Sequence, residues 1–99
     1  MRKVLVTIAY EVEPSKREAY LAHAREMREH ARETLGIDYE VYEDLDHPGG
    51  FVELFTCASR EDYDALDEKQ DDAFRDMVAR LERFTDLRSV QYRALEQLG

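Results

Sequence analysis

Residues 4–10 read Val-Leu-Val-Thr-Ile-Ala-Tyr, and this stretch decides the fold. Its β-branched and apolar residues occupy both alternating sets, which predicts a strand over residues 3–12 that is covered on both faces. Pro14 then interrupts the strand, and Ser15-Lys16-Arg17-Glu18 has the pattern of a capping box that begins a helix. We expect this helix to end at Gly36, because glycine readily adopts the left-handed conformation that closes helices.

The predicted helix carries an apolar stripe at spacings of three and four, formed by Tyr20, Ala24, Met27, Ala31 and Leu35. Two further strands are predicted at residues 37–45 and 51–58, joined by turn residues at 46–50. The strand over 37–45 alternates apolar and polar residues, so one of its faces is exposed to water. The strand over 51–58 is apolar on both faces, like the first strand.

Ser59 and Asp71 each precede a short helical pattern, and residues 88–95 predict a fourth strand. The order β-α-β-β-α-α-β is that of the ferredoxin-like split βαβ fold, an α+β class with a four-stranded antiparallel sheet. That fold places the first and third strands at the centre, which agrees with their two apolar faces. Because helices cover only one face of such a sheet, the other face needs a partner, and a second copy of the chain is the simplest one.

We therefore expect a homodimer in which two sheets pack face to face as a dimeric α+β barrel. Each chain of 99 residues is one domain over residues 1–99, because it is too short for two cores. The alternating sets of strand residues do not say which face meets the partner. The set that faces the partner contains either Leu5, Phe51 and Phe55 or the residues that alternate with them.

The composition excludes several classes of partner. The chain has 23 acidic and 14 basic residues, a net charge of −9, which repels phosphate backbones and anionic lipid surfaces. We therefore expect no nucleic-acid partner and no membrane association. No apolar run reaches the roughly 20 residues of a membrane span, and no cleavage pattern follows the basic N-terminus. Cys57 is the only cysteine, which excludes an intramolecular disulfide and indicates a cytoplasmic location.

The chain resembles the antibiotic biosynthesis monooxygenase family, which has a dimeric α/β barrel fold. The resemblance rests on the stretches Val12–Glu18, Tyr39–Asp44, Gly50–Leu54 and Ala58–Tyr63, and on Phe74. It covers nearly the whole chain. The superfamily includes cofactor-free oxygenases of phenolic or quinol-like compounds. The resemblance therefore implies a cofactor-independent monooxygenase, an oxidoreductase that acts on or binds a small aromatic molecule.

The chain also departs from the patterns of that superfamily. The haem-degrading branch uses an Asn, a Trp and a His, and these places fall at Ile8, Leu66 and Val78; the chain contains no Trp. Haem degradation is therefore not expected. Many oxygenases have an aromatic residue near the end of strand three and a His in the second helix. Here the strand position is Cys57, and residues 60–80 contain no His. A second hypothesis thus stays open: a non-catalytic small-molecule-binding or structural homodimer.

Five residues are candidates for the site that the resemblance implies. Cofactor-free oxygenation needs a substrate that supplies its own electrons, so the protein contributes a base, hydrogen-bond donors and a dry cavity. We predict catalytic roles for His23 and Tyr63. We predict that the substrate is bound by Tyr20, Phe74 and Arg75. The structural alternative is that the histidine is a partly exposed helix residue and that the tyrosines belong to the core.

No motif indicates a metal or a bound cofactor, and we expect neither. His23 and His30 are seven residues apart, roughly 10 Å along a helix, which is too far to chelate one ion. The acidic run between Asp62 and Asp72 lacks the central glycine of a calcium loop, so we interpret it as a solvated helix surface. Phosphate-binding glycine loops, zinc motifs and paired cysteines are absent from the sequence.

Overall fold

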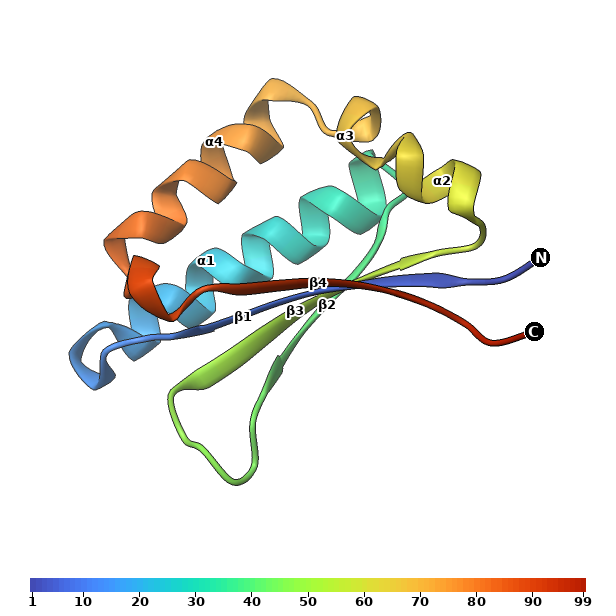
Figure 1. The fold of residues 1–99 in the computed structure, drawn as a ribbon. Helices are drawn as coiled ribbons and strands as arrows, with labels where there is room; N and C mark the ends of the chain where they lie inside the picture. The colour runs from blue at the N-terminus through green and yellow to red at the C-terminus, as the bar shows by residue number, and fades with distance from the viewer.

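The computed structural model describes residues 1–99, in which four strands form one antiparallel sheet of order β2-β3-β1-β4. The strands are β1 (Val4–Glu11), β2 (Asp38–Glu43), β3 (Gly50–Cys57) and β4 (Gln91–Glu96). The two strands with two apolar faces, β1 and β3, are central, as the sequence predicts. The α+β class and the ferredoxin-like order of elements are therefore confirmed (Figure 1).

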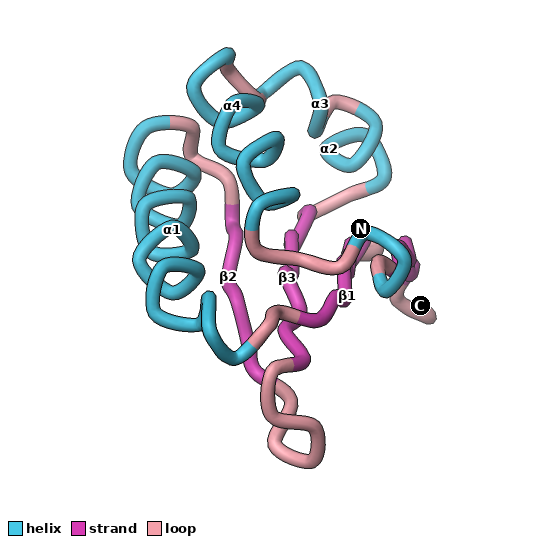
Figure 2. The backbone as a smooth tube through the Cα atoms, turned by 90° about the vertical axis from the view of Figure 1, so that its left-hand side faces the viewer, coloured by secondary structure: helices cyan, strands magenta, loops and turns pink.

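All the helices lie on one side of this sheet, and its other face is bare (Figure 1). The long helix α1 (Arg17–Glu29) continues as a wider turn, η2 (His30–Thr34), and then reaches Gly36, whose φ of +65° ends the helix as predicted. In Figure 2, α1 lies to the left of the strands, beside β2, and α4 lies above them. The other helical segments are η1 (Pro14–Lys16), α2 (Arg60–Asp64), α3 (Leu66–Lys69), α4 (Asp72–Arg80), η3 (Leu81–Arg83) and η4 (Leu87–Ser89). None of them has the length and apolar character that a membrane span needs.

Two predicted boundaries are wrong, and a tight turn explains each. The capping box at Ser15 does not form, because Pro14–Lys16 make a 3₁₀ turn and α1 begins at Arg17 without a side-chain cap. Proline has a fixed φ that suits the first position of such a turn. The last strand begins at Gln91 rather than at residue 88, because Leu87–Ser89 form another 3₁₀ turn.

The other predicted helix starts are confirmed. Ser59 Oγ accepts a hydrogen bond from the backbone N–H of Asp62 at 3.2 Å, which caps α2. Asp71 Oδ1 accepts one from the backbone N–H of Phe74 at 2.8 Å, which caps α4. Such caps satisfy amides that have no partner within the helix, and each contributes about 1 kcal/mol. The second cap fixes where α4, and hence Phe74, meets the sheet.

The side chains of β1 and β3 divide into two sets. The set that faces the helices contains Val6, Tyr10, Phe51, Glu53 and Phe55, all of them buried. The opposite set contains Leu5, Thr7, Ala9, Val52, Leu54 and Thr56, all of them only partly buried in the single chain. The structure thus decides which residues the helices cover: Phe51 and Phe55 lie under them, and Leu5 lies on the bare face. A single chain leaves the sheet open, so its closure by a second copy stays a prediction.

Candidate functional site

A cavity of about 340 Å³ lies between the sheet and α4, on the side of β4. Its volume is at the lower end of the roughly 300–1,000 Å³ that is typical of small-molecule sites. Most of the lining is apolar, with contributions from β1, β3, β4 and α4. Apolar residues that line it are Ile8, Phe55, Leu66, Phe74, Val78 and Leu81. The cavity therefore offers a dry surface on which an aromatic ring can pack.

A second hollow, of about 520 Å³, lies beside the β2–β3 turn. Its two opposed charged groups bind each other: Arg17 donates from both terminal nitrogens to Glu43, with Nη2 to Oε1 at 2.7 Å. The Arg17 guanidinium and the backbone N–H of Gly49 together lower the pKa of Glu43 to about 2. Asp44 also lines this hollow and accepts a hydrogen bond from the backbone N–H of Asp46, so each charged group of the lining already has a partner. The cavity beside β4 is the candidate site.

Glu53 is the buried carboxyl of this cavity. It lies in the middle of β3, faces the helices and is only 2% exposed. The hydroxyl of Tyr39, on β2, donates to Glu53 Oε1 at 2.6 Å. Burial raises the pKa of Glu53 above its ordinary value, and hydrogen bonds from Tyr39 and Tyr10 oppose that rise. A carboxyl with a raised pKa in an apolar cavity is suited to take up and release a proton.

Glu53, with the Tyr39 hydroxyl bonded to it, forms a polar wall of the cavity, and two more tyrosines extend it. Tyr10, on β1, lines the cavity, and its hydroxyl lies 2.7 Å from that of Tyr20 on α1. Burial is the main cause that raises the pKa of both hydroxyls, so they keep their hydrogens at neutral pH. They therefore serve as hydrogen-bonding groups rather than as phenolates, and the carboxyl is the group of this wall that is suited to exchange protons.

Three of the five predicted site residues lie at or near this cavity. Phe74 lines it directly and is completely buried. Tyr20 does not line the cavity itself, but its hydroxyl is hydrogen-bonded to that of Tyr10, which does. Tyr63, on α2, reaches the open edge, where its hydroxyl lies 3.4 Å from that of Tyr92 on β4. The catalytic role of Tyr63 stays a prediction.

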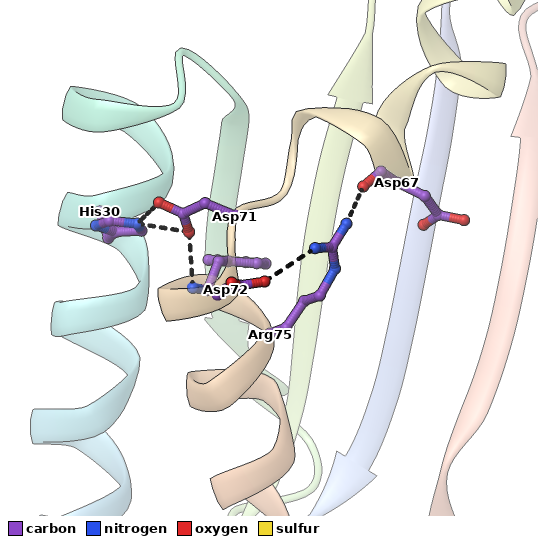
Figure 3. Close-up of polar contacts among 6 residues, drawn as sticks. His30, Asp67, Asp71, Asp72 and Arg75 are labelled. Atoms are coloured by element: carbon purple, nitrogen blue, oxygen red, sulfur yellow. Dashed lines mark hydrogen bonds and ion pairs between the residues drawn. The ribbon is translucent and has the colours of Figure 1, made fainter.

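The structure does not bring His23 and Arg75 to the cavity. His23 Nε2 lies 2.7 Å from the backbone oxygen of Met77, so this nitrogen carries the hydrogen and links α1 to α4. Arg75 lies on the outside of α4, where it contacts Asp72 at 3.5 Å and donates to the backbone oxygen of Asp67 at 3.0 Å (Figure 3). The catalytic role of His23 stays a prediction, as does binding of a substrate by Arg75.

A second link from α1 positions the cavity wall. His30 Nε2 lies 2.9 and 2.8 Å from the two carboxylate oxygens of Asp71 (Figure 3). The backbone N–H of Phe74 and then His30 lower the pKa of Asp71. The same carboxylate therefore caps α4 and ties its first turn to α1. This arrangement holds the ring of Phe74 over the sheet, 5.9 Å from the ring of Tyr39.

No group of three histidine, cysteine or acidic side chains is placed to hold a metal ion. The positions that correspond to the haem-degrading residues, Ile8, Leu66 and Val78, all line the cavity, where each presents an apolar side chain. No polar side chain at these positions is available to orient a haem. These three positions therefore add no polar group to the cavity wall, in which Glu53 is the buried carboxyl.

Glu53 is not among the residues predicted for the site, although the sequence carries a signal for it. The strand that contains it is apolar on both faces, and position 53 shares its parity with Phe51 and Phe55. A charged residue in that register shares a covered face with two phenylalanines, where glutamate is seldom found without a functional or pairing reason. The hydroxyl partners come from other strands and from α1, so the sequence alone does not indicate them.

Solved structures share this fold. No protein-family model matches the chain, and no curated protein matches it in sequence. A conserved protein from Methanosarcina mazei superimposes with a TM-score of 0.82 at 20% identity, over 99% of this chain and 95% of its own. Rv0793 from Mycobacterium tuberculosis superimposes with a TM-score of 0.75 at 25% identity, over 98% and 96%.

A third structure carries the name antibiotic biosynthesis monooxygenase; it superimposes with a TM-score of 0.69 at 20% identity, over 100% of this chain and 98% of its own. Several other structures with this arrangement are named for the same family. The shared features are the four-stranded antiparallel sheet and the layer of helices on one face. The chain therefore has the α+β fold of the structures named for antibiotic biosynthesis monooxygenases.

Proposed function

We propose that the chain is a cofactor-independent monooxygenase-like protein that acts on a small phenolic or quinol-type molecule in the cavity beside β4. The observation that carries the proposal is the carboxyl of Glu53, which is buried in an apolar cavity of small-molecule size and bonded to the Tyr39 hydroxyl. In this proposal Glu53 is the general base and acid. The names of the solved structures with this fold support the reaction class.

The chemistry needs little beyond a proton acceptor and a dry site. A base that removes a proton from an activated CH₂ group next to a phenolic ring makes the substrate electron-rich enough to react with O₂. A carbon–oxygen bond forms to give a hydroperoxide, which then loses water. The CH₂ group becomes a carbonyl, and one oxygen atom of O₂ stays on the carbon. The other leaves as water with both hydrogens, so atoms and electrons balance.

Oxygen uptake tests this proposal. An anthrone, which carries an activated CH₂ group beside a phenol-forming carbonyl, serves as the test compound in air-saturated buffer. Removal of a general base lowers a rate by roughly 10²- to 10⁴-fold. We expect the wild type to consume O₂ well above the background rate and Glu53→Gln to lose most of that excess. Glu26→Gln changes an exposed glutamate of α1 and is the matched control.

Two results would overturn the assignment of Glu53. One is full activity in a folded Glu53→Gln variant; the other is activity that disappears in His23→Ala or Tyr63→Phe but survives without the Glu53 carboxyl. Circular dichroism verifies that each variant is folded. Saturable binding of the anthrone with no O₂ consumption by the wild type would instead favour the alternative, a non-catalytic small-molecule-binding protein.

We further propose that the bare face of the sheet is covered by a second copy of the chain. That face carries Leu5, Val52 and Leu54, only partly buried in one chain, and a same-chain partner covers such a face symmetrically. Light scattering is expected to give twice the 11.7 kDa of one chain. Leu54→Glu should give monomers, and Ala22→Glu, on the exposed side of α1, should not. A wild type of 11.7 kDa at micromolar concentration would refute the dimer.

We also propose a cytoplasmic location, because the free thiol of Cys57 suits a reducing compartment.

A further inference from the structure

The charge of the cavity lining is entirely of one sign. Besides Glu53, the lining includes the carboxyl-bearing residues Asp67 and Glu82, and it includes no lysine, arginine or histidine. A cavity lined by one sign of charge attracts ligands of the opposite sign and disfavours those of the same sign. The net charge of −9 adds to this field. An anionic ligand such as a carboxylate or a phosphate finds no partner here.

The surrounding elements carry basic residues, but these lie outside the cavity lining. Lys69, at the end of α3, lines a different hollow beside Cys57. Arg75 is occupied on the outer side of α4, and Arg88 lies 3.3 Å from Asp86. None of them lines the cavity, so the three carboxyl groups are not neutralised from the neighbouring helices and turns.

The register of the sheet sets the length of the site. Ile8 is paired with Glu53 on one side and with Tyr92 on the other, so the three residues form one row on the helix-facing side. Adjacent strands are about 4.8 Å apart, which separates the backbones of Glu53 and Tyr92 by roughly 10 Å. A single aromatic ring with a short side chain therefore spans the row above Ile8. The Glu53 end is dry, and the Tyr92 end is open, since Tyr92 is 59% exposed.

At the open end of the row, the ring of Tyr92 and the carboxylate of Asp67 are groups that can bind a cation. The hydrogen bond with Tyr63, burial, and the nearby charges of Tyr63 and Asp67 raise the pKa of Tyr92 to about 12. The Asp67 carboxylate forms no ion pair, and it extends away from the guanidinium of Arg75, which binds only its backbone oxygen (Figure 3). A free carboxylate beside an accessible tyrosine ring attracts an ammonium group through its charge and through the face of the ring.

We propose that the substrate of this site is a phenolic aromatic amine, with its phenol end at Glu53 and its ammonium group between Asp67 and Tyr92. This inference rests on the proposed function, whose substrate class it narrows from aromatic molecules in general to those with a positive side chain. The ring lies over Ile8, and the phenol donates a hydrogen bond to the buried carboxyl, at the end of the molecule where the reacting CH₂ group of the proposed function would lie. The exposed carboxylate fixes the orientation of the molecule.

Three catechols with one ring and different side chains test the charge preference: dopamine, 4-ethylcatechol and 3,4-dihydroxyphenylacetate. Calorimetric titration without oxygen measures binding alone. We expect dopamine to bind about three- to tenfold more tightly than 4-ethylcatechol, and the acid at least tenfold more weakly than 4-ethylcatechol. The preference for dopamine should shrink in 0.5 M NaCl, because salt screens exposed charges.

A pair of variants locates the ammonium group. Asp67→Asn should weaken dopamine binding about three- to tenfold and leave 4-ethylcatechol binding within twofold. Glu68→Gln is the matched control, because Glu68 is an exposed carboxylate next to Asp67 on α3 that does not line the cavity. It should leave the preference for dopamine nearly intact.

Each outcome separates this inference from the proposed function. Equal binding of all three catechols, tighter binding of the acid, or a loss of the dopamine preference in Glu68→Gln but not in Asp67→Asn would overturn the assignment of an amine. None of these results would affect the oxygen-uptake assay with Glu53→Gln. If none of the catechols binds, the amine-bearing ligand is refuted, while an anthrone that still supports O₂ consumption would preserve the proposed function.

Discussion

The two halves of the helix-covered sheet face are built differently. Under α1 the packing is complete: Tyr20, Met27 and Tyr39 are fully buried. Beside β4 it is incomplete, because every residue of β4 is exposed and the cavity fills the space below α4. One amphipathic helix of 13 residues covers the first half, whereas α2, α3 and α4, of 5, 4 and 9 residues, share the second. Broken helices leave the room that a ligand needs.

Glu53 lies at the border between the two halves. Its hydrogen-bond donor, Tyr39, belongs to the packed half, whereas the cavity that it lines belongs to the open half. The packed half therefore holds the carboxyl in a fixed position, and the open half gives a ligand access to it. A reactive group needs such support, since a group that is misplaced by a fraction of an ångström loses much of its effect.

Truncation of one ring in each half is expected to show the largest difference. Tyr20→Ala removes a completely buried ring of α1 that packs against Phe51 and Tyr10, and should lower the free energy of unfolding by about 3–5 kcal/mol. Tyr92→Ala removes a largely exposed ring and should cost less than about 1 kcal/mol. Urea unfolding measures both. Equal losses would mean that the β4 side is as tightly packed as the α1 side.

The pH dependence of stability tests the burial of Glu53. Its pKa in the folded chain is above the ordinary 4.5, so between these two values the folded state keeps a proton that the unfolded state releases. The free energy of unfolding therefore falls as the pH rises through this window, by at most about 1.4 kcal/mol per pH unit. Relative to the wild type, Glu53→Gln should therefore gain stability as the pH rises through this window and keep that gain at higher pH. A constant difference across pH 4–8 would contradict the raised pKa.

Glu43 should show the opposite dependence. Its pKa is lowered to about 2, chiefly by the hydrogen bonds from Arg17, so its contribution to stability is complete above pH 4.5 and is lost as the pH falls toward 2. Glu43→Gln should therefore flatten the stability curve below pH 4.5 and leave the region above it unchanged in slope. Acid titration followed by circular dichroism measures this. A flattening above pH 4.5 would contradict this prediction, because that is the region in which Glu53, and not Glu43, should set the slope.

The order of elements, the central strands and most helix boundaries could be predicted from local patterns. The alternation in residues 4–10, the apolar stripe of α1 and the N-caps Ser59 and Asp71 each act within a few residues of the chain. The two wrong boundaries arose at 3₁₀ turns, where a tight turn competes with a regular element and the sequence signals for both are similar.

The candidate site was harder to predict, because its parts are distant in sequence. Phe74 was recognised from a helical pattern that also fixes its orientation toward the sheet. The link between Glu53 and Tyr39 depends on the pairing of β2 with β3, and that between Tyr10 and Tyr20 on how α1 crosses β1. His23 has the pattern of a site residue, yet its partner is a backbone oxygen of α4, which no sequence pattern indicates.

The central claim, that the open half of the sheet face binds a small aromatic molecule beside Glu53, is tested most directly by methyl NMR. A titration with 4-ethylcatechol without oxygen compares the methyl groups of the cavity, those of Ile8 and Val78, with those of the bare face, Val52 and Leu54. We predict saturable shifts at Ile8 and Val78 and none at Val52 and Leu54. The absence of saturable shifts, or larger shifts at Val52 and Leu54, would contradict the claim.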